Sequence, residues 1–235
     1  MPELKIEDLH KSYQIGGKTH TVLKGLNLSA DCGSITVLVG KSGCGKTTLL
    51  RLICGLEVPD SGTISLPPNT KCGMMFQEAR LMPWLTCEKN ITFGLPKTYD
   101  HTRIRALIQT VGLQGFENAY PAQLSGGMQQ RAALARTLAR DSRLILMDEP
   151  FAALDYFTRG TMQQELLRIK KIAGTGIVFV THNIDEALIL GDTITVLSGG
   201  TAAKTFSLPA SGARDILSEP FIGIKREILS VMKTS

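Results

Sequence analysis

A glycine-rich segment between an apolar run and a helix-like run constrains the fold of this chain more than any other feature. Residues Gly40–Thr47 read Gly-Lys-Ser-Gly-Cys-Gly-Lys-Thr and fit the pattern GxxxxGK[ST]. The apolar, β-branched run Ile35–Val39 predicts a strand buried on both faces, and Lys46–Ile53 predicts a helix that ends near Gly55. Strand, tight loop and helix in this order form the context in which the motif binds phosphate. The sequence therefore predicts an α/β fold around a phosphate-binding loop.

The residue types in this loop explain how it can hold a phosphate group. Glycines let backbone N–H groups turn towards phosphate oxygens, and the start of the following helix adds partial positive charge. Lys46 can reach the β- and γ-phosphates of a nucleotide, and the Thr47 hydroxyl can bind Mg²⁺. A glycine-rich turn is the simpler alternative, but the flanking strand and helix favour a phosphate site.

Polar residues follow two further apolar runs. Asp148 and Glu149 come after Leu144–Met147, and His182 follows Ile177–Val180. Adjacent strand residues point to opposite faces, so the two acids need not share a role. Asp148 can hold Mg²⁺, and Glu149 can polarise a water that attacks a γ-phosphate. All three residues follow predicted parallel strands, at the edge where open α/β sheets bind ligands. The simpler alternatives are that Asp148 and Glu149 only form a polar strand end and that His182 has a structural role.

Periodicity elsewhere predicts further strands and helices around this core. Leu4–Leu9 alternates like a half-buried strand, and Leu26–Ala30 can pair with it. Thr161–Ile172 has helical periodicity between the second and third apolar runs, which predicts a parallel sheet flanked by helices. Ile194–Leu197 and Thr201–Phe206 predict a late hairpin.

The middle of the chain has a different character. Arg103–Gly112 and Met128–Arg140 read as helices, and little strand signal surrounds them. We therefore interpret residues 78–140 as a helical subdomain that is inserted into an α/β core. That core would consist of residues 1–77 and 141–235.

Composition excludes several classes of protein. Hydrophobic residues make up 43% of the chain and charged residues 20%, as in globular proteins and unlike disordered chains. The net charge of +5 suits anionic ligands, but no dense run of Lys and Arg marks a nucleic-acid surface. No run approaches about 18 apolar residues, and the first residues lack the apolar core of a signal peptide. We therefore expect no membrane-spanning segment.

A second segment with adjacent glycines, Leu124–Arg131, reads Leu-Ser-Gly-Gly-Met-Gln-Gln-Arg. Ser125 can cap a helix that begins near Met128, and Gly126 and Gly127 expose backbone N–H groups. The segment therefore predicts a second helix start that can bind an anion. A plain capped helix is the alternative for this segment taken alone.

This segment resembles the signature motif of ATP-binding cassette (ABC) ATPases, and the order of motifs is similar to that family over essentially the whole chain. The resemblance implies a P-loop NTPase (RecA-like) core with an antiparallel β subdomain and a helical subdomain that carries the signature. It also implies ATP hydrolysis with ATP and Mg²⁺ as ligands. The resemblance places Tyr13 at the nucleotide, where it would stack on adenine; a surface aromatic is the alternative. It also places there the residues of the Walker A loop, which are Gly40, Lys41, Ser42, Gly43, Cys44, Gly45, Lys46, Thr47 and Thr48.

The same resemblance implies roles for the polar residues. Glu149 would be the catalytic glutamate, Gln77 would meet Mg²⁺ and the attacking water, and His182 would contact the γ-phosphate. The residues implied as Mg²⁺ ligands are Thr47, Gln77 and Asp148.

The resemblance also implies a dimer, because two cassettes of this family pair head to tail. Ser125, Gly126 and Gly127 would then serve the nucleotide held by the partner copy. Ala153-Leu154-Asp155 resembles the D-loop of that interface, although Ala153 replaces a common Ser. Lys41 also departs from the family, because it stands where this group commonly has Pro.

A narrower resemblance concerns membrane partners. Met82–Thr86 and Thr181–Ala187 are similar to segments of importers of the nitrate, sulfonate and taurine group. This implies an importer ATPase subunit, peripheral at the cytoplasmic face of the inner membrane and held there by transmembrane permease subunits. A substrate-binding protein would be reached only through the permease. Trp84 can line the groove that receives the permease, or it can pack inside the helical lobe.

Two other functions remain open at this point. A soluble ABC ATPase acting on nucleic acid or ribosomes usually carries coiled-coil insertions, zinc modules or duplicated cassettes, and none is visible in the sequence. A non-catalytic module with the same fold is the third alternative. The presence of Lys46, Asp148, Glu149 and His182 favours an active ATPase. We therefore expect an importer subunit with no nucleic-acid partner.

Overall fold

Two β-sheets form the frame of the chain in the computed structural model, which describes residues 3–140, 142–209 and 214–233. The smaller sheet is antiparallel and has the order β2-β1-β4, and the larger has the order β5-β6-β7-β3-β8-β9. In the larger sheet β9 is antiparallel to β8, and all other neighbours are parallel. The strands are β1 (Glu3–Ile15), β2 (Lys18–Asp31), β3 (Ile35–Val39), β4 (Ser61–Ser65), β5 (Cys72–Met75), β6 (Leu144–Asp148), β7 (Gly176–Thr181), β8 (Thr193–Ser198) and β9 (Thr201–Ser207).

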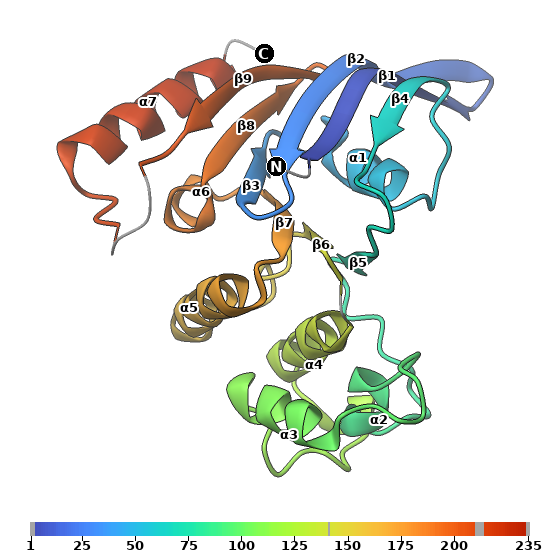
Figure 1. Cartoon of the computed structure of the whole chain (residues 1–235). Coiled ribbons are helices and arrows are strands. Elements are labelled where there is room, and N and C mark those ends of the chain that lie inside the picture. Colours follow the sequence, from blue (N-terminus) through green and yellow to red (C-terminus); the bar gives the residue numbers. More distant parts are fainter. Residues whose placement is uncertain (1–2, 141, 210–213, 234–235) are drawn as a thin grey trace.

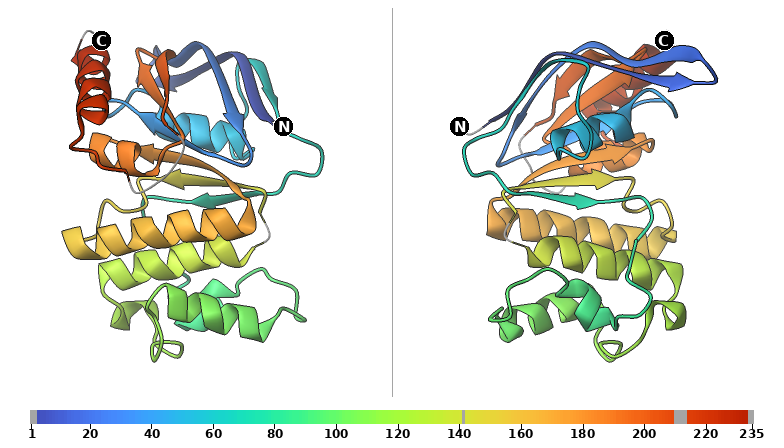
Figure 2. Two further views of the ribbon diagram at one scale, coloured as in Figure 1. Left: turned by 60° about the vertical axis from the view of Figure 1, so that its left-hand side comes forward. Right: turned by 90° about the vertical axis from the view of Figure 1, so that its right-hand side faces the viewer.

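Helices cover the sheets and extend the molecule at one end (Figure 1). Helix α1 packs between the two sheets, and both views of Figure 2 show α4 and α5 side by side on the other face of the larger sheet. α2 and α3 lie beyond α4. The helices are α1 (Lys46–Ile53), α2 (Cys87–Ile91), α3 (His101–Thr110), the 3-10 helix η1 (Pro121–Gln123), α4 (Gly126–Ala139), α5 (Tyr156–Ala173), α6 (Ile184–Leu190) and α7 (Glu219–Lys233).

The central strands of the larger sheet are buried on both faces. Along β3, Val37 and Val39 belong to one apolar cluster, and Leu38 between them belongs to another. β6 and β7 alternate between the same two clusters. Apolar residues on both faces are typical of parallel strands with a covered face on each side. The three apolar runs that were expected to be strands are therefore confirmed, and they end at one edge of the sheet.

The other predicted pairings and the first helix are also confirmed. β1 and β2 pair antiparallel, with Leu4 opposite Ala30 and Leu9 opposite Leu26. The late hairpin is β8 and β9. α1 has the predicted bounds. α5 begins five residues before the predicted Thr161, because the Asp155 carboxylate caps it and accepts hydrogen bonds from the first-turn N–H groups at 3.1 and 3.0 Å.

The helical region has an apolar core of its own, to which α2, α3 and α4 contribute. α4 is buried on two faces: Ala132 and Ala139 pack in this core, while Ala133 and Leu138 pack against the larger sheet. α3 and α4 each begin two residues before their predicted starts, where Asp100 and Ser125 cap them. We propose that residues 78–140 form a subdomain that α4 joins to the core.

Two observations bear on membrane contact. Trp84 is 70% exposed, so the alternative in which it packs inside the helical lobe is wrong. Among the residues that the structure describes, no helix has the length and apolar character needed to cross a bilayer.

Candidate active site

The phosphate-binding loop connects β3 to α1. Gly45 precedes α1 with a φ of 101°, in the left-handed region that favours glycine, and a Cβ there would lie 2.7 Å from the Leu23 side chain. No side chain caps this helix start in the described part of the chain. The N–H groups of its first turn are therefore left without the usual side-chain acceptor, which suits an anion.

Lys46 is the buried cation of this loop, with 7% of the residue exposed. Its Nζ donates hydrogen bonds to the carbonyl oxygens of Gly40 at 2.7 Å and Lys41 at 2.9 Å. A buried ammonium group needs such partners, because desolvation of an unpaired charge is unfavourable. Phosphate oxygens offer a stronger, charged acceptor for the same group.

A cleft of about 750 Å³ lies along the loop and is large enough for a nucleotide. The structure brings Gln77, Glu149 and His182 to the same cleft, although these residues are far apart in the sequence. Their catalytic roles stay predictions. Residues 40–43 and 45–48 of the loop also line the cleft, together with Val22 and Met232.

The acidic edge of the cleft is built by β6 and β7. Asp148 is the last residue of β6, and the N–H of Glu149 continues the pairing with β7 by donating to the Val180 carbonyl at 3.0 Å. Glu149 has a φ of 46°, in a region that non-glycine residues rarely occupy. Its Oε2 lies 3.0 Å from Nδ1 of His182. The unusual backbone turn thus carries the carboxylate into the cleft and against the histidine.

The two neighbouring acids have different surroundings. Burial raises the pKa of the Asp148 carboxyl above its ordinary value, and the charge of Glu149 acts in the same direction. The Thr47 hydroxyl, which hydrogen-bonds to Asp148, and the cations Lys46 and Arg51 partly offset this shift of the pKa. Ionised Asp148 is therefore a buried anion whose negative charge is only partly compensated by its neighbours. A divalent cation bound to it would complete that compensation.

Asp148→Asn is expected to raise the melting temperature of the nucleotide-free protein at neutral pH. Since the pKa of Asp148 is raised in the folded state, its ionisation destabilises that state as the pH rises above about 4, and the penalty persists at neutral pH. Asparagine keeps the size and an acceptor oxygen without the charge. Thermal melts between pH 4 and pH 8 with a chelator should show the gain at neutral pH and its decline towards pH 4.

Asp155→Asn provides a matched control for this experiment. Hydrogen bonds from the Thr158 hydroxyl and from backbone N–H groups of the α5 start lower the pKa of Asp155, so its ionised form is favoured in the folded protein. Removal of this charge is expected to lower the melting temperature at neutral pH. A gain for Asp155→Asn, or a loss for Asp148→Asn, would contradict the electrostatic interpretation.

Gln77 is held in place from the helical region. Its carbonyl oxygen accepts a hydrogen bond from the side chain of Gln130 in α4. Arg136, also in α4, donates to the carbonyl oxygens of Ala79 and Arg80, both at 2.8 Å. The loop that carries Gln77 is therefore fixed to α4 by three hydrogen bonds, none of which the sequence revealed.

Other predicted site residues are not among those that line this cleft, although the Tyr13 hydroxyl hydrogen-bonds to Thr48, which does line it. Ser125 and Gly126 are exposed at the start of α4, where the Ser125 hydroxyl accepts a hydrogen bond from the Met128 N–H at 3.3 Å, and Gly127 follows them. Tyr13 does not line the cleft, and its hydroxyl contacts Glu57. Sequence reasoning placed Tyr13 on adenine and Ser125–Gly127 at a partner's nucleotide. Both assignments stay predictions.

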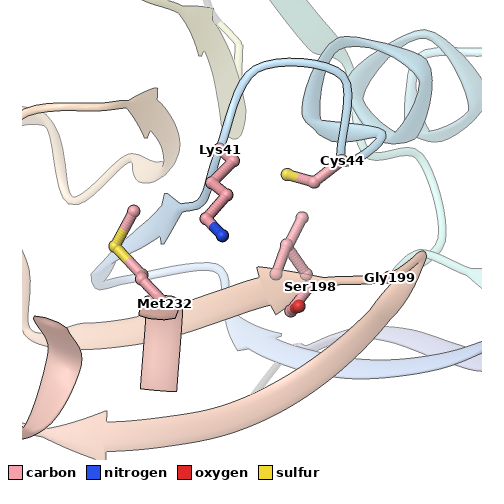
Figure 3. A pocket seen from close by; sticks show the side chains of 6 residues that line it. Lys41, Cys44, Ser198, Gly199 and Met232 are labelled. Carbon is pink, nitrogen blue, oxygen red and sulfur yellow. The ribbon is translucent and has the colours of Figure 1, made fainter. Parts of the chain in front are cut away.

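One lining residue escaped sequence reasoning altogether. Met232, near the end of α7, lines the cleft and also a smaller cavity of about 80 Å³ beside the loop. Figure 3 shows its side chain together with Lys41 and Cys44 of the loop and Ser198 of β8 around this cavity. Nothing in the local sequence of α7 signals a contact with residues almost two hundred positions earlier.

Comparison with known proteins decides the family. A sequence profile described as ABC transporter matches residues 23–152, which is more than half of the chain. The chain belongs to the ABC transporter family. It is 43% identical to an uncharacterised ABC transporter ATP-binding protein of Methanocaldococcus jannaschii, over 98% of this chain and 91% of that protein. It is 42% identical to the aliphatic sulfonates import ATP-binding protein SsuB 1 of Shouchella clausii, over 97% of this chain and 90% of that protein.

Solved ABC structures agree with the observed fold. A dimeric ATP-binding cassette in a post-hydrolysis state, bound to ADP and inorganic phosphate, superposes with a TM-score of 0.79. It is 30% identical and covers 88% of this chain and 100% of its own. As a member of this family the chain is an ATPase, and its P-loop core, antiparallel sheet and helical region are those of an ABC cassette.

The residues of this ABC cassette fit a magnesium nucleotide. Lys46 and the uncapped α1 start suit the phosphates, and buried Asp148 with the Thr47 hydroxyl offers oxygen ligands for Mg²⁺. Mg²⁺ at such sites takes one or two carboxylates, and phosphate oxygens and water complete its shell. In the described residues no group of three or more His, Cys, Asp and Glu side chains could hold a metal alone. These oxygen ligands therefore suit a Mg²⁺ ion that binds together with the nucleotide, whose phosphate oxygens supply the remaining ligands.

Proposed function

We propose that the chain is the ATPase subunit of an importer that takes up a small solute, with aliphatic sulfonates as the favoured class and nitrate and taurine as the others. The observation that carries the ATPase part of this proposal is that Lys46, Glu149 and His182 line the same cleft. The SsuB relative in Shouchella clausii supports the solute class. The relatives lend no support to an ATPase that acts on nucleic acid or ribosomes.

In the proposed reaction each group has one task. Lys46 holds the β- and γ-phosphates. Glu149 polarises a water and accepts its proton while the water oxygen bonds to the γ-phosphorus, and the bond to the ADP oxygen breaks, which leaves ADP and inorganic phosphate. His182, paired with Glu149, contacts the γ-phosphate. Mg²⁺, held by Thr47, Asp148 and Gln77, would neutralise charge on the phosphate oxygens. These assignments follow the family resemblance and fit the positions of the side chains.

We further propose that a second copy completes the site. Ser125, Gly126 and Gly127 do not line the chain's own cleft, but they form a capped helix start with open N–H groups. Such a group suits the phosphates of a nucleotide held by another copy. The dimeric state of the solved ABC cassette supports this arrangement. Exposed Trp84 is proposed to contact the transmembrane permease subunits, which would hold the chain at the cytoplasmic face of the membrane.

Reconstitution tests the proposed function. The chain would be purified with the membrane subunits encoded beside it, placed in liposomes with the matching binding protein, and supplied with Mg-ATP. We expect ATP-dependent uptake of an aliphatic sulfonate, and a loss of about tenfold or more for Trp84→Ala because a large anchor at an interface is removed. ATP hydrolysis by the isolated Trp84→Ala chain should remain as in the wild type.

Three results would correct the proposal. Uptake of nitrate or taurine instead of sulfonates would keep the importer and change the solute. Hydrolysis without any uptake would contradict the importer assignment. Full uptake by Trp84→Ala would remove this residue from the permease contact.

A further inference from the structure

An ion pair with a buried carboxylate, next to His182, links three segments of the fold. Glu186 of α6 lies with its Oε1 3.5 Å from Nε of Arg159, in the first turn of α5. Its Oε2 accepts a hydrogen bond of 2.5 Å from the hydroxyl of Thr181, the last residue of β7. Arg159 also donates from Nη2 to the carbonyl oxygen of Leu154 at 3.0 Å. The pair therefore ties the turn before α5 to the end of β7 and the start of α6.

This pair adjoins the catalytic groups. The Thr181 hydroxyl, which donates to Glu186, accepts a hydrogen bond of 3.0 Å from the N–H of Asn183, so it bridges the backbone on both sides of His182. A cavity of about 60 Å³ separates the pair from the Glu149–His182 contact, and Glu149, Arg159, His182 and Glu186 all line it. His182 thus sits in a short backbone segment whose two ends meet at the Thr181 hydroxyl, which the buried Glu186 carboxylate holds in turn.

The burial of Glu186 makes this arrangement sensitive to its charge. Its side chain is 7% exposed, whereas that of Arg159 is 30% exposed. A buried carboxylate needs a cation and hydrogen-bond donors, and removal of one partner leaves an uncompensated charge. Nε of Arg159 is itself buried and has no hydrogen-bond partner among the described residues, so its interaction with Glu186 at 3.5 Å is ionic. Each member of the pair therefore depends on the other for its position.

We propose that Arg159 and Glu186 are positioning residues for ATP hydrolysis. They hold His182 against Glu149, and they couple this contact to the turn at Leu154, which precedes α5. Neither residue touches the nucleotide cleft. The inference rests on the proposed roles of Glu149 and His182.

The test compares two Glu→Gln variants of the full chain. Glu186→Gln keeps the volume and an oxygen that accepts from Thr181, but it removes the charge that faces Arg159. Glu165→Gln makes the same chemical change at the more exposed ion pair between Glu165 and Arg168, which lies on the same helix as Arg159. Three quantities would be measured for each variant: kcat and KM for ATP, the melting temperature, and the imidazole cross-peaks in ¹H–¹³C NMR spectra.

We expect Glu186→Gln to lower kcat by about tenfold with KM for ATP changed by less than about twofold, because orientation is lost while binding groups remain. The chain has four histidines, which lets NMR report on geometry without catalysis. The cross-peaks of His182 should shift in Glu186→Gln, while those of His10, His20 and His101 should not. Glu165→Gln should leave the cross-peaks of all four histidines unchanged, and it should also leave kcat unchanged.

Two outcomes would overturn the inference. One is an unshifted His182 in folded Glu186→Gln; the other is a kcat within twofold of the wild type. A variant that does not fold would be replaced by Thr181→Val, which removes the hydroxyl bridge and leaves the ion pair, and the same two outcomes apply. The NMR spectra report the position of His182 whether or not Glu149 and His182 are catalytic, which Glu149→Gln tests separately. A failure of the positioning role can therefore be distinguished from a failure of the proposed catalytic roles.

Discussion

Replacement of Glu149 by glutamine is expected to slow ATP hydrolysis by roughly 10²-fold or more while ATP still binds. The carboxylate lies 3.0 Å from His182 at the edge of the cleft, where it can polarise a water. Glutamine has the same shape and must adopt the same left-handed backbone, so the variant tests the charge alone. Steady-state hydrolysis and calorimetric titration with ATP would measure the two effects.

The same variant also tests the dimer, because ATP that binds without being hydrolysed should hold two copies together. Size exclusion with light scattering should show a monomer without nucleotide and a dimer with Mg-ATP. Ser125→Arg, which changes the exposed helix start outside the chain's own cleft, should block the dimer without preventing ATP binding. Near-wild-type turnover of Glu149→Gln would remove Glu149 from its catalytic role, and an unchanged monomer would contradict dimerisation by ATP alone.

Replacement of Lys46 by methionine is expected to reduce hydrolysis by about 10²-fold or more and to weaken ATP binding by about tenfold or more. A buried, charge-assisted hydrogen bond to phosphate is lost, and methionine fills most of the space without donating. The Kd for ATP and the rate of hydrolysis would be measured at several salt concentrations.

Lys41→Met is the matched comparison, because Lys41 belongs to the same loop and lines the same cleft but is exposed. An exposed charge is screened by solvent and ions, so its loss should weaken ATP binding by less than tenfold, and less still at high salt. Equal effects of the two substitutions would show that the loop acts through its net charge and not through a specific contact of Lys46.

The sequence predicted the parts of the fold in which local signals agree with the tertiary structure. β3 and β7 are mostly β-branched, β6 begins with the apolar run Leu-Ile-Leu-Met, and α1 follows a glycine loop, so the positions of all four were predicted within a residue. β5, in contrast, reads Cys-Gly-Met-Met and lacks a strand signal, so its pairing with β6 comes only from the fold. The short helix α6 and the amphipathic helix α7 were not predicted at all.

The candidate site shows the same division. The order of apolar runs predicted that Gly40, Asp148 and His182 follow parallel strands at the ligand-binding edge of one sheet, and Gly40 and His182 do line the cleft. This order did not predict the left-handed backbone of Glu149, the Arg159–Glu186 pair or the position of Met232. These features depend on contacts between segments that no local pattern connects.

The two buried faces of α4 have a mechanical consequence. The helix packs between two apolar cores, and the side chains of Arg136 and Gln130 hydrogen-bond to the loop that carries Gln77. Ser125 lies eleven positions before Arg136, or about 16 Å along the axis. A tilt of about 10° around Arg136 would therefore swing Ser125 by about 3 Å. A small movement of the Gln77 loop beside one nucleotide can thus be transmitted along α4. The resulting displacement of Ser125 is large enough to make or break a hydrogen bond at the surface that would face the nucleotide of a second copy.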